Sequence, residues 1–300
     1  MCVTFFRLGG PGEAHRLVLA FNRDEEFDRP AAGAHWWPGA PNGGVLGGRD
    51  LVRGGTWLGM TRSGRLALLT NVREPPPAAP PPAGAPSRGS FVARFLLGVQ
   101  SPEGYVEHLK ATLDPAGSGF NLVCMDLQGP PGAGRASYLT NRRNGGGLFT
   151  ARLRPGATYG LSNAGLDVPW PKVEAGKAAF EGMVLGPGMD GGGAALAGLL
   201  DLLRDARRVE DPARVPVTGV PPAVEQRLSG IFVEPFPRPG GGGLYGTRTS
   251  TAVTVAAGGD AAWLERDRRL SGEGGGEGGR WAEREIRFAM AAGRALPQYA

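Results

Sequence analysis

The order of apolar and polar runs in this 300-residue chain predicts an α+β fold built on antiparallel sheets. Strand-like runs come first, helical segments follow, and the two kinds then return in groups. Such grouping differs from the regular strand–helix alternation of a parallel sheet. Gly- and Pro-rich turn clusters between the strand-like runs mark where these strands end.

The N-terminal segment predicts strands over 2–8 and 16–21, joined by the turn cluster GGPGEA. The second strand runs directly into NRDEEFDRP, so a dense polar cluster is expected at its C-terminal end. Residues 54–71 predict a hairpin around Ser63-Gly64, which ends on Asn71.

The centre of the chain begins with the Pro/Ala-rich REPPPAAPPPAGAP, which predicts an extended or disordered loop. Helical spacing follows over 91–99 and 105–113. Ser101 is the expected N-cap of the second helix, and Pro102 its first residue. Buried strands are then expected over 119–127 and 135–141 as antiparallel partners, with a short strand over 157–162.

The rest of the chain predicts helices and then strands. Helices are expected over 169–184, 192–208 and 222–229, and strands over 244–256, 261–268 and 280–289.

Composition and charge narrow the class of protein. There are 33 Lys and Arg against 28 Asp and Glu, and the two signs are scattered, which favours a solvated surface and no nucleic-acid partner. Cys2 and Cys124 offer neither a disulfide framework nor metal-ligand spacing, so a reducing compartment is favoured. The sequence contains neither a transmembrane run nor the pattern of a signal peptide, which makes the cytoplasm the expected location.

Two other kinds of site find little support. GGGLYGT has the glycine spacing of a phosphate loop but lacks its lysine, so a flexible loop is favoured. His15, His35 and His108 form no i,i+4 pair, and no metal site is predicted. A haem ligand from Cys2, Cys124 or a histidine stays open, because a single axial ligand needs no spacing pattern.

Cys2 allows two interpretations. It could begin a buried strand as a small apolar residue. Alternatively, removal of Met1 would leave a thiol and an α-amine on one residue, which together make a nucleophile and its base.

Polar side chains at four predicted strand ends favour the second interpretation. They are the run 22–25, Asn71, Asn163 and Arg248. Amide groups can stabilise an oxyanion, and arginine lowers the pKa of a neighbouring carboxylate and can hold a thiol as thiolate. The alternative is structural, with Asp24 and Arg248 as a buried ion pair. The candidate catalytic residues are Cys2, Arg23, Asp24, Asn71, Asn163 and Arg248.

These stretches resemble a known family. MCVTFF, LAFNRDEEFDRP, GGTWLGMTRSGRLALLTNVRE, GFNLVCMDL, TYGLSNAGLDVPWPKV and YGTRTSTAV are similar, in the same order, to the NRDE family, also called the transport and Golgi organization protein 2 family. The resemblance extends more distantly to N-terminal nucleophile (Ntn) hydrolases of the choloylglycine hydrolase and penicillin V acylase group.

The resemblance implies a single domain over 1–300 with a four-layer αββα Ntn-hydrolase-like sandwich of two antiparallel sheets flanked by helices. Low-complexity loop insertions are expected near 74–87, 186–193, 237–243 and 271–279. These segments are longer than the resemblance to the family leads us to expect, and we interpret them as surface loops.

Matching of the motifs implies that Cys2 is the nucleophile and that Arg23 and Asp24 are its neighbours. It also implies that Asn163 and Arg248 are the oxyanion and clamp residues. Asn71 matches the family pattern less well. In the hydrolases two residues separate the first Arg from the Asp, whereas here they are adjacent. Adjacent residues leave a strand in opposite directions. Glu25 or Glu26 is therefore an alternative for the carboxylate beside Cys2.

Two functions follow from the resemblance. One is a cysteine-dependent amidohydrolase or acyl transferase that cleaves a carbon–nitrogen bond of an apolar acyl compound and requires no cofactor. The other is a non-catalytic carrier of haem or of a lipid or acyl-CoA, with links to haem trafficking, lipid metabolism, Golgi organisation and protein secretion. Mitochondrial or Golgi association is then an alternative to the cytoplasm.

Overall fold

The structure is a computed structural model, and it describes most of the chain. The described residues are 2–41, 44–75, 87–115, 117–142, 147–166, 168, 170–187, 189, 193–238, 241–269 and 280–291.

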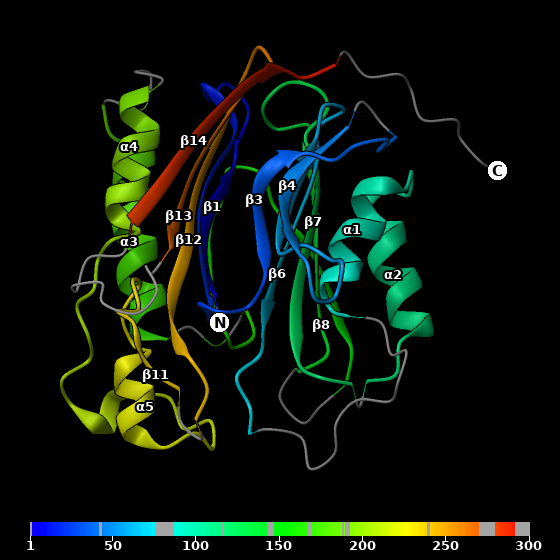
Figure 1. The fold of residues 1–300 in the computed structure, drawn as a ribbon. Helices are drawn as coiled ribbons and strands as arrows, with labels where there is room; N and C mark the ends of the chain where they lie inside the picture. The colour runs from blue at the N-terminus through cyan, green and yellow to red at the C-terminus, as the bar shows by residue number, and fades with distance from the viewer. Residues whose placement is uncertain are drawn as a thin grey trace.

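Two seven-stranded sheets face each other, and neighbouring strands within each sheet pair antiparallel (Figure 1). Sheet A has the order β10-β1-β2-β12-β13-β14, with β11 also paired to β12, and sheet B runs from β3 to β9 in chain order. Sheet A contains β1 (Cys2–Leu8), β2 (His15–Glu26), β10 (Thr158–Leu161), β11 (Phe236–Pro237), β12 (Leu244–Ala256), β13 (Asp260–Arg269) and β14 (Arg280–Ala289). Sheet B contains β3 (Ala31–Trp36), β4 (Val45–Asp50), β5 (Leu58–Thr61), β6 (Arg65–Asn71), β7 (Phe120–Asp126), β8 (Arg135–Thr140) and β9 (Phe149–Leu153).

Helices cover the outer face of each sheet, as Figure 1 shows. α3 (Pro171–Leu185) and α4 (Gly193–Leu202) lie against sheet A, and α1 (Gly89–Leu97) and α2 (Pro102–Thr112) against sheet B. α5 (Pro222–Arg227) and a short 3₁₀ helix at Pro212–Arg214 lie between α4 and β11 in the chain. The layers are therefore helices, sheet, sheet and helices, which confirms the predicted α+β sandwich.

The side chains of β1 and β2 alternate between two hydrophobic cores, one on each face of sheet A. Phe6 and Leu19 point into the apolar layer between the sheets, whereas Phe5 and Val18 point toward α3 and α4. Because successive side chains of a strand face opposite ways, one strand fills both layers. Gly176 of α3 fits this packing, since a Cβ there would overlap the ring of Phe5.

The local signals in the sequence located most elements correctly. Pro102 begins α2, and the Ser101 hydroxyl accepts a hydrogen bond from the Gly104 amide at 3.0 Å, which confirms the predicted N-cap. The hairpin around Ser63-Gly64 is β5 and β6, and Gly64 has a φ of +80° that favours glycine.

The polar NRDE run differs from its prediction, because it lies inside a strand instead of beyond a strand end. β2 extends to Glu26, since β12 pairs with it as far as Tyr245 and satisfies its backbone. Strands β3, β4 and β9 were not predicted either. Their sequences AAGAHW, VLGGRD and FTARL carry weak strand signals of their own, and their pairing within sheet B stabilises them.

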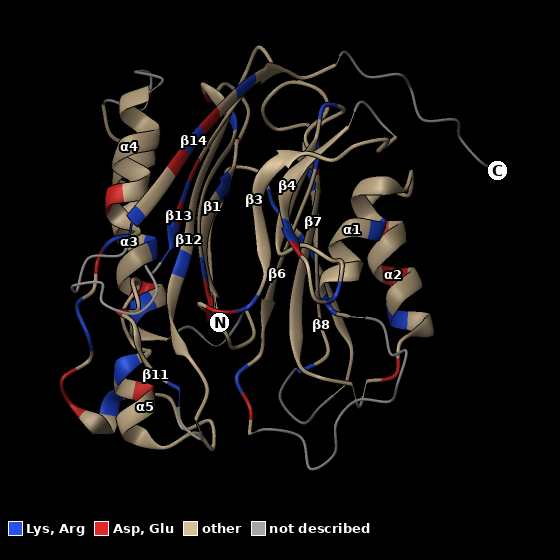
Figure 2. Ribbon diagram, in the orientation of Figure 1, with Lys and Arg blue, Asp and Glu red and all other residues tan. Residues whose placement is uncertain are grey.

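The predicted insertions coincide with much of the chain outside the described residues. Residues 76–86, 188, 190–192, 239–240 and 270–279 belong to this part. Figure 2 shows positive and negative residues interspersed over the ribbon. Within the described ranges, no helix is both long and apolar enough to cross a membrane.

Candidate active site

A pocket of about 860 Å³ opens beside Cys2, and residues of both sheets border it. Cys2 begins β1 of sheet A, and its side chain faces the layer between the two sheets. Contributions also come from the turn after β4, the start of α1 and the segment between α2 and β7. The apolar part of its lining is Val52, Trp57, Leu69, Phe91, Leu113 and Phe120.

Cys2 and Arg23 are direct neighbours across β1 and β2, on the face that looks toward sheet B. Both border the pocket, and the Arg23 guanidinium lies over the ring of Trp57 at 4.1 Å. Its Nη2 is 3.3 Å from Glu25 Oε2. Within the described part of the chain, the buried Nη1 of Arg23 has no hydrogen-bond partner.

Asp24 points the other way, toward the helical layer outside sheet A. Its Oδ1 accepts a hydrogen bond of 2.6 Å from the Thr247 hydroxyl, and the Tyr245 hydroxyl donates to its backbone carbonyl at 3.0 Å. The residue borders the pocket but is almost wholly buried. Burial raises the pKa of Asp24, and the N-terminal amine, the Lys172 ammonium and the Thr247 hydrogen bond oppose this shift.

Glu25 is the carboxylate that shares the pocket face of β2 with Arg23. Burial raises the pKa of Glu25, but Arg23 and other positive charges outweigh it and hold the pKa below its ordinary value. Glu26 instead forms an ion pair with Arg238. Adjacent residues thus do face opposite ways, as the sequence predicted, and both Asp24 and Glu25 border the pocket.

Asn71 and Asn163 meet at the ends of β6 and β10. The fully buried Asn163 donates from its side-chain Nδ2 to the Asn71 carbonyl at 2.7 Å, and its own carbonyl accepts from the Arg73 amide at 2.8 Å. Next to it, the Ser162 hydroxyl donates to the Cys2 carbonyl at 2.9 Å. Asn71 borders the pocket, whereas Asn163 is not among the residues that do. Asn163 therefore joins the end of β10 to the end of β6, and the neighbouring Ser162 joins the end of β10 to Cys2.

Arg248 occupies a β-bulge of β12, where the pairing with β2 shifts between Thr247 and Thr249. A bulge redirects a side chain out of the regular alternation. Its Nη1 donates to the carbonyls of Glu26 at 3.1 Å and of Arg29, so it fastens the turn after β2. Burial lowers the pKa of Arg248, and the positive charge of Arg23 adds to this shift, but Arg248 does not border the pocket.

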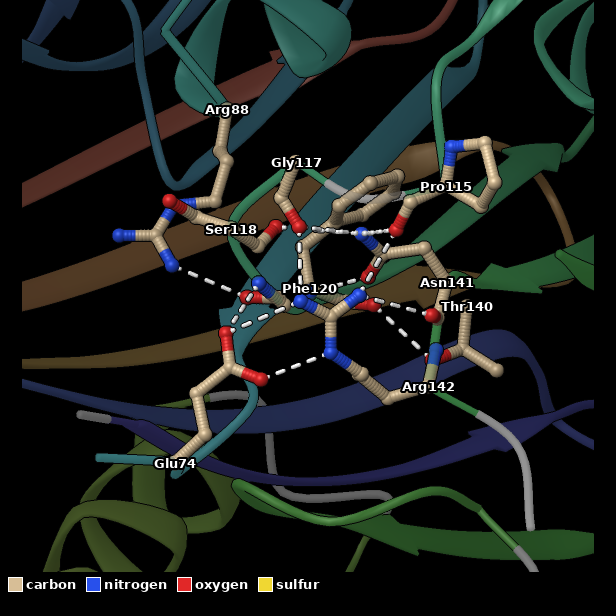
Figure 3. A network of polar contacts seen from close by, with 10 residues as sticks. Glu74, Arg88, Pro115, Gly117, Ser118, Phe120, Thr140, Asn141 and Arg142 are labelled. Atoms are coloured by element: carbon tan, nitrogen blue, oxygen red, sulfur yellow. Dashed lines mark hydrogen bonds and ion pairs between the residues drawn. The ribbon is translucent and has the colours of Figure 1, made fainter. Parts of the chain in front are cut away.

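A polar network orders the pocket wall next to β7 (Figure 3). Arg142 holds the Glu74 carboxylate through Nε at 2.7 Å and donates to the carbonyls of Pro115 and Gly117. The Asn141 side chain accepts from the Phe120 amide at 2.8 Å. Together these contacts fix the loop that carries Leu113, Asp114, Gly117 and Ser118 into the pocket wall.

Arg88, at the start of α1, adds a positive charge to this wall. One of its nitrogens donates to the Gly119 carbonyl at 2.9 Å. Among the residues that the structure describes, no carboxylate lies within 4.0 Å of it. Trp57 and Arg88 were not predicted as site residues, because a tryptophan within a predicted hairpin and an arginine just before a predicted helix do not by themselves indicate a site. The described residues also contain no group of three or more His, Cys, Asp and Glu side chains that could hold a metal ion.

The thiol of Cys2 is protonated at neutral pH in this chain. Burial, together with the Asp24 carboxylate, raises its pKa to about 11 against the opposing positive charges of the N-terminal amine and Arg23. We therefore expect iodoacetamide to alkylate Cys2 slowly at pH 7 when Met1 is retained, with a rate that climbs toward pH 11. Peptide mass spectrometry across this pH range measures the profile, and a rate already maximal at pH 8 would contradict it.

The fold and the pocket together define an αββα sandwich protein whose first strand carries a cysteine to a mixed apolar and charged pocket. Comparison with known families agrees with the sequence resemblance. The family model described as Transport and Golgi organisation 2 matches residues 1–269. The chain belongs to this family.

Relatives from animals match most of the chain. The Transport and Golgi organization protein 2 homolog of Homo sapiens is 33% identical over 309 residues, which cover 97% of this chain and 99% of the relative. The homolog of Bos taurus is 34% identical over 276 residues, which cover 89% of this chain and 92% of the relative. The protein of Drosophila melanogaster is 30% identical over 271 residues, which cover 85% of this chain and 88% of the relative.

Two solved structures are more distantly similar. A mutant of the conjugated bile acid hydrolase from Clostridium perfringens aligns with a TM-score of 0.46 at 10% identity, covering 100% of this chain and 97% of its own. A Caenorhabditis elegans ortholog of N-acylethanolamine-hydrolyzing acid amidase aligns with a TM-score of 0.42 at 12% identity, covering 76% and 98%.

Proposed function

We propose that, once Met1 is removed, the pocket at Cys2 is the active site of an amidohydrolase or acyl transferase that acts on an apolar acyl compound. The observation that carries the proposal is the position of Cys2. It begins the first strand, borders the pocket and faces Arg23 across two paired strands. A new α-amine would then lie on the nucleophile's own residue, and one residue would supply both nucleophile and base.

The reaction would proceed in two steps. The Cys2 sulfur bonds to the acyl carbon, the carbon–nitrogen bond breaks, and the thiol proton passes through the α-amine to the departing amine. Water, or an acceptor amine or alcohol, then attacks the thioester. The α-amine takes the proton of this attacking group, and the Cys2 sulfur regains a proton as the acyl product leaves.

The residues that line the pocket suit an apolar acyl compound that reacts at Cys2. Trp57, Phe91 and Phe120 offer apolar surface for an acyl chain, and Arg23 supplies a guanidinium next to the sulfur. Asn71 and Asn141 are the side-chain amides that border the pocket. The Asn141 amide is already bonded to the Phe120 amide and the Gly117 carbonyl, so we assign the oxyanion contact to Asn71. Asn163 then acts through Asn71, whose carbonyl it binds.

The mature N-terminus tests the proposal directly. We expect intact mass spectrometry to show Met1 removed, and this form to release 4-nitroaniline from N-dodecanoyl-4-nitroanilide. Protein produced with an inhibitor of methionine aminopeptidase retains Met1 and is the matched control, which we expect to be inactive because its α-amine is one residue away. Equal activity of both forms would refute the proposed mechanism.

The alternative proposal is a non-catalytic carrier in the same pocket, and the protonated thiol favours it. Among the described residues that border the pocket, Cys2 is the one with a sulfur or imidazole for haem. Titration with haem and with dodecanoate, followed by absorbance and tryptophan fluorescence, separates the two functions. Saturable binding without turnover by either form supports the carrier.

A further inference from the structure

Two of the arginines that border the pocket are neutralised by carboxylates of the pocket itself. The Arg29 Nε lies 2.8 Å from Asp50 Oδ2, and the Arg23 Nη2 lies 3.3 Å from Glu25 Oε2. Asp24 faces the helical layer outside sheet A, where its carboxylate accepts the Thr247 hydrogen bond. These three carboxylates are therefore engaged with other groups.

Arg53 and Arg88 also border the pocket, and within the described ranges neither forms an ion pair. Arg88 is partly buried, and its Nη1 donates to the Gly119 carbonyl at 2.9 Å, which holds the guanidinium at the pocket wall. This bond uses one of the five N–H groups that a guanidinium offers. The fourth carboxylate that borders the pocket is Asp114, in the segment between α2 and β7. Positive charge therefore exceeds negative charge on this side of the pocket.

The two arginines lie on segments that contact each other. The Ser87 hydroxyl donates to the Arg53 carbonyl at 3.5 Å, and the Thr56 amide donates to the Gly89 carbonyl at 3.2 Å. Helix α1 begins at Gly89, its first turn contains no acidic residue, and no side chain caps it. The positive end of the helix dipole thus lies beside Arg88. We call Arg53, Arg88 and the start of α1 the cationic wall.

A buried donor borders the same pocket. Arg23 is 4% exposed, and within the described part of the chain its Nη1 has no hydrogen-bond partner. Its guanidinium lies over the ring of Trp57, the residue that follows Thr56 of the contact described above. Buried N–H groups are almost always satisfied, so a ligand that supplies an acceptor would account for this donor.

We propose that the ligand of this pocket carries an anionic group, a carboxylate or a phosphate, and that Arg88 and Arg53 of the cationic wall bind it. A guanidinium matches the paired oxygens of both acids. The apolar lining suits the acyl chain, which assigns the acid group to the amine part of the substrate. This last assignment rests on the proposed function. The anion site itself does not, because a carrier would hold its ligand with the same arginines.

A series of three probes with one acyl chain and one amide tests the proposal. N-dodecanoylglycine carries a carboxylate, N-dodecanoylethanolamine phosphate a phosphate, and N-dodecanoylethanolamine a neutral hydroxyl. Tryptophan fluorescence of the Cys2→Ala protein measures binding without turnover. We expect the anionic probes to bind about 10-fold more tightly or better, and the tighter of the two identifies the acid. Equal affinity for all three probes would overturn the proposal.

Variants of Arg88 locate the anion site. We expect Arg88→Met to lower the affinity for the anionic probes about 10-fold and that for the neutral probe less than two-fold. Arg88→Lys, which retains the charge, should lose less. Arg94 is an exposed arginine of the same helix, and Arg94→Met is the matched control. An equal loss for all three probes in Arg88→Met would indicate a packing role and contradict the anion site.

Turnover by the protein without Met1 separates this proposal from the hydrolase function. We expect release of glycine from N-dodecanoylglycine with a higher kcat/KM than release of ethanolamine from the neutral probe. Should no probe be cleaved while the binding preference depends on Arg88, the hydrolase function fails and the anion site stands. Cleavage with equal kcat/KM and equal binding of the two would leave the hydrolase function and refute the anion site.

Discussion

Replacing Cys2 with alanine is expected to lower turnover of an N-acyl probe by about 10³-fold or more, since the nucleophile of a covalent mechanism is then missing. Binding of the acyl product dodecanoate should change only a few-fold, because Trp57, Phe91 and Phe120 still form the apolar wall. Initial rates and tryptophan fluorescence measure the two quantities on the same preparation.

Cys124→Ala is the matched control for this experiment. Cys124 is the other free thiol of the chain, and it is buried in the apolar layer between sheet B and helices α1 and α2. Burial also raises its pKa, so it does not compete for an alkylating reagent at neutral pH. Turnover should stay within a few-fold in this variant. Activity that survives Cys2→Ala would exclude the covalent mechanism.

Replacing Glu225 with leucine is expected to lower the free energy of unfolding by about 3–5 kcal/mol, as measured by urea denaturation. Glu225 and Arg73 form an ion pair in which the side chains are 1% and 4% exposed. The variant leaves the Arg73 guanidinium buried over the Trp170 ring without its carboxylate. An unpaired buried charge explains the large effect.

Two further variants distinguish this pair from an ordinary ion pair. Adding Arg73→Met to Glu225→Leu should recover much of the loss, because an apolar pair of similar volume can replace a buried ion pair. Lys110→Met breaks the exposed pair with Glu107 at 3.8 Å and should cost less than about 1 kcal/mol. A Glu225→Leu effect as small as that of Lys110→Met would show that the buried pair contributes little.

Local sequence signals were sufficient for much of the fold. The Ser101-Pro102 cap, the Ser63-Gly64 turn and the apolar spacing of the helices depend on residues close together in the chain, and the structure contains all three. Strands β3, β4 and β9 could not be predicted in this way. Their pairing partners within sheet B stabilise them, and short segments do not encode those partners.

The same distinction applies to the site. Cys2, Arg23, Asp24 and Asn71 border the pocket, as the sequence grouped them. The β-bulge that turns Arg248 toward the carbonyls of the turn after β2 depends on how two distant strands pair, and no local pattern revealed it. The buried ion pair of Arg73 and Glu225 was also missed.

Strand β2 lies between the layer that contains the pocket and the helical layer outside sheet A, and successive residues of β2 face opposite layers. The Arg23 side chain faces sheet B and the Asp24 side chain faces the helical layer, so the order of these two residues decides on which side of the sheet each charge lies. A shift of β2 by one residue would exchange them and place a carboxylate opposite the thiol and a guanidinium among the buried cations. The order of the residues in the NRDE run therefore decides which face of the sheet each charge occupies, in addition to supplying polar groups to the site.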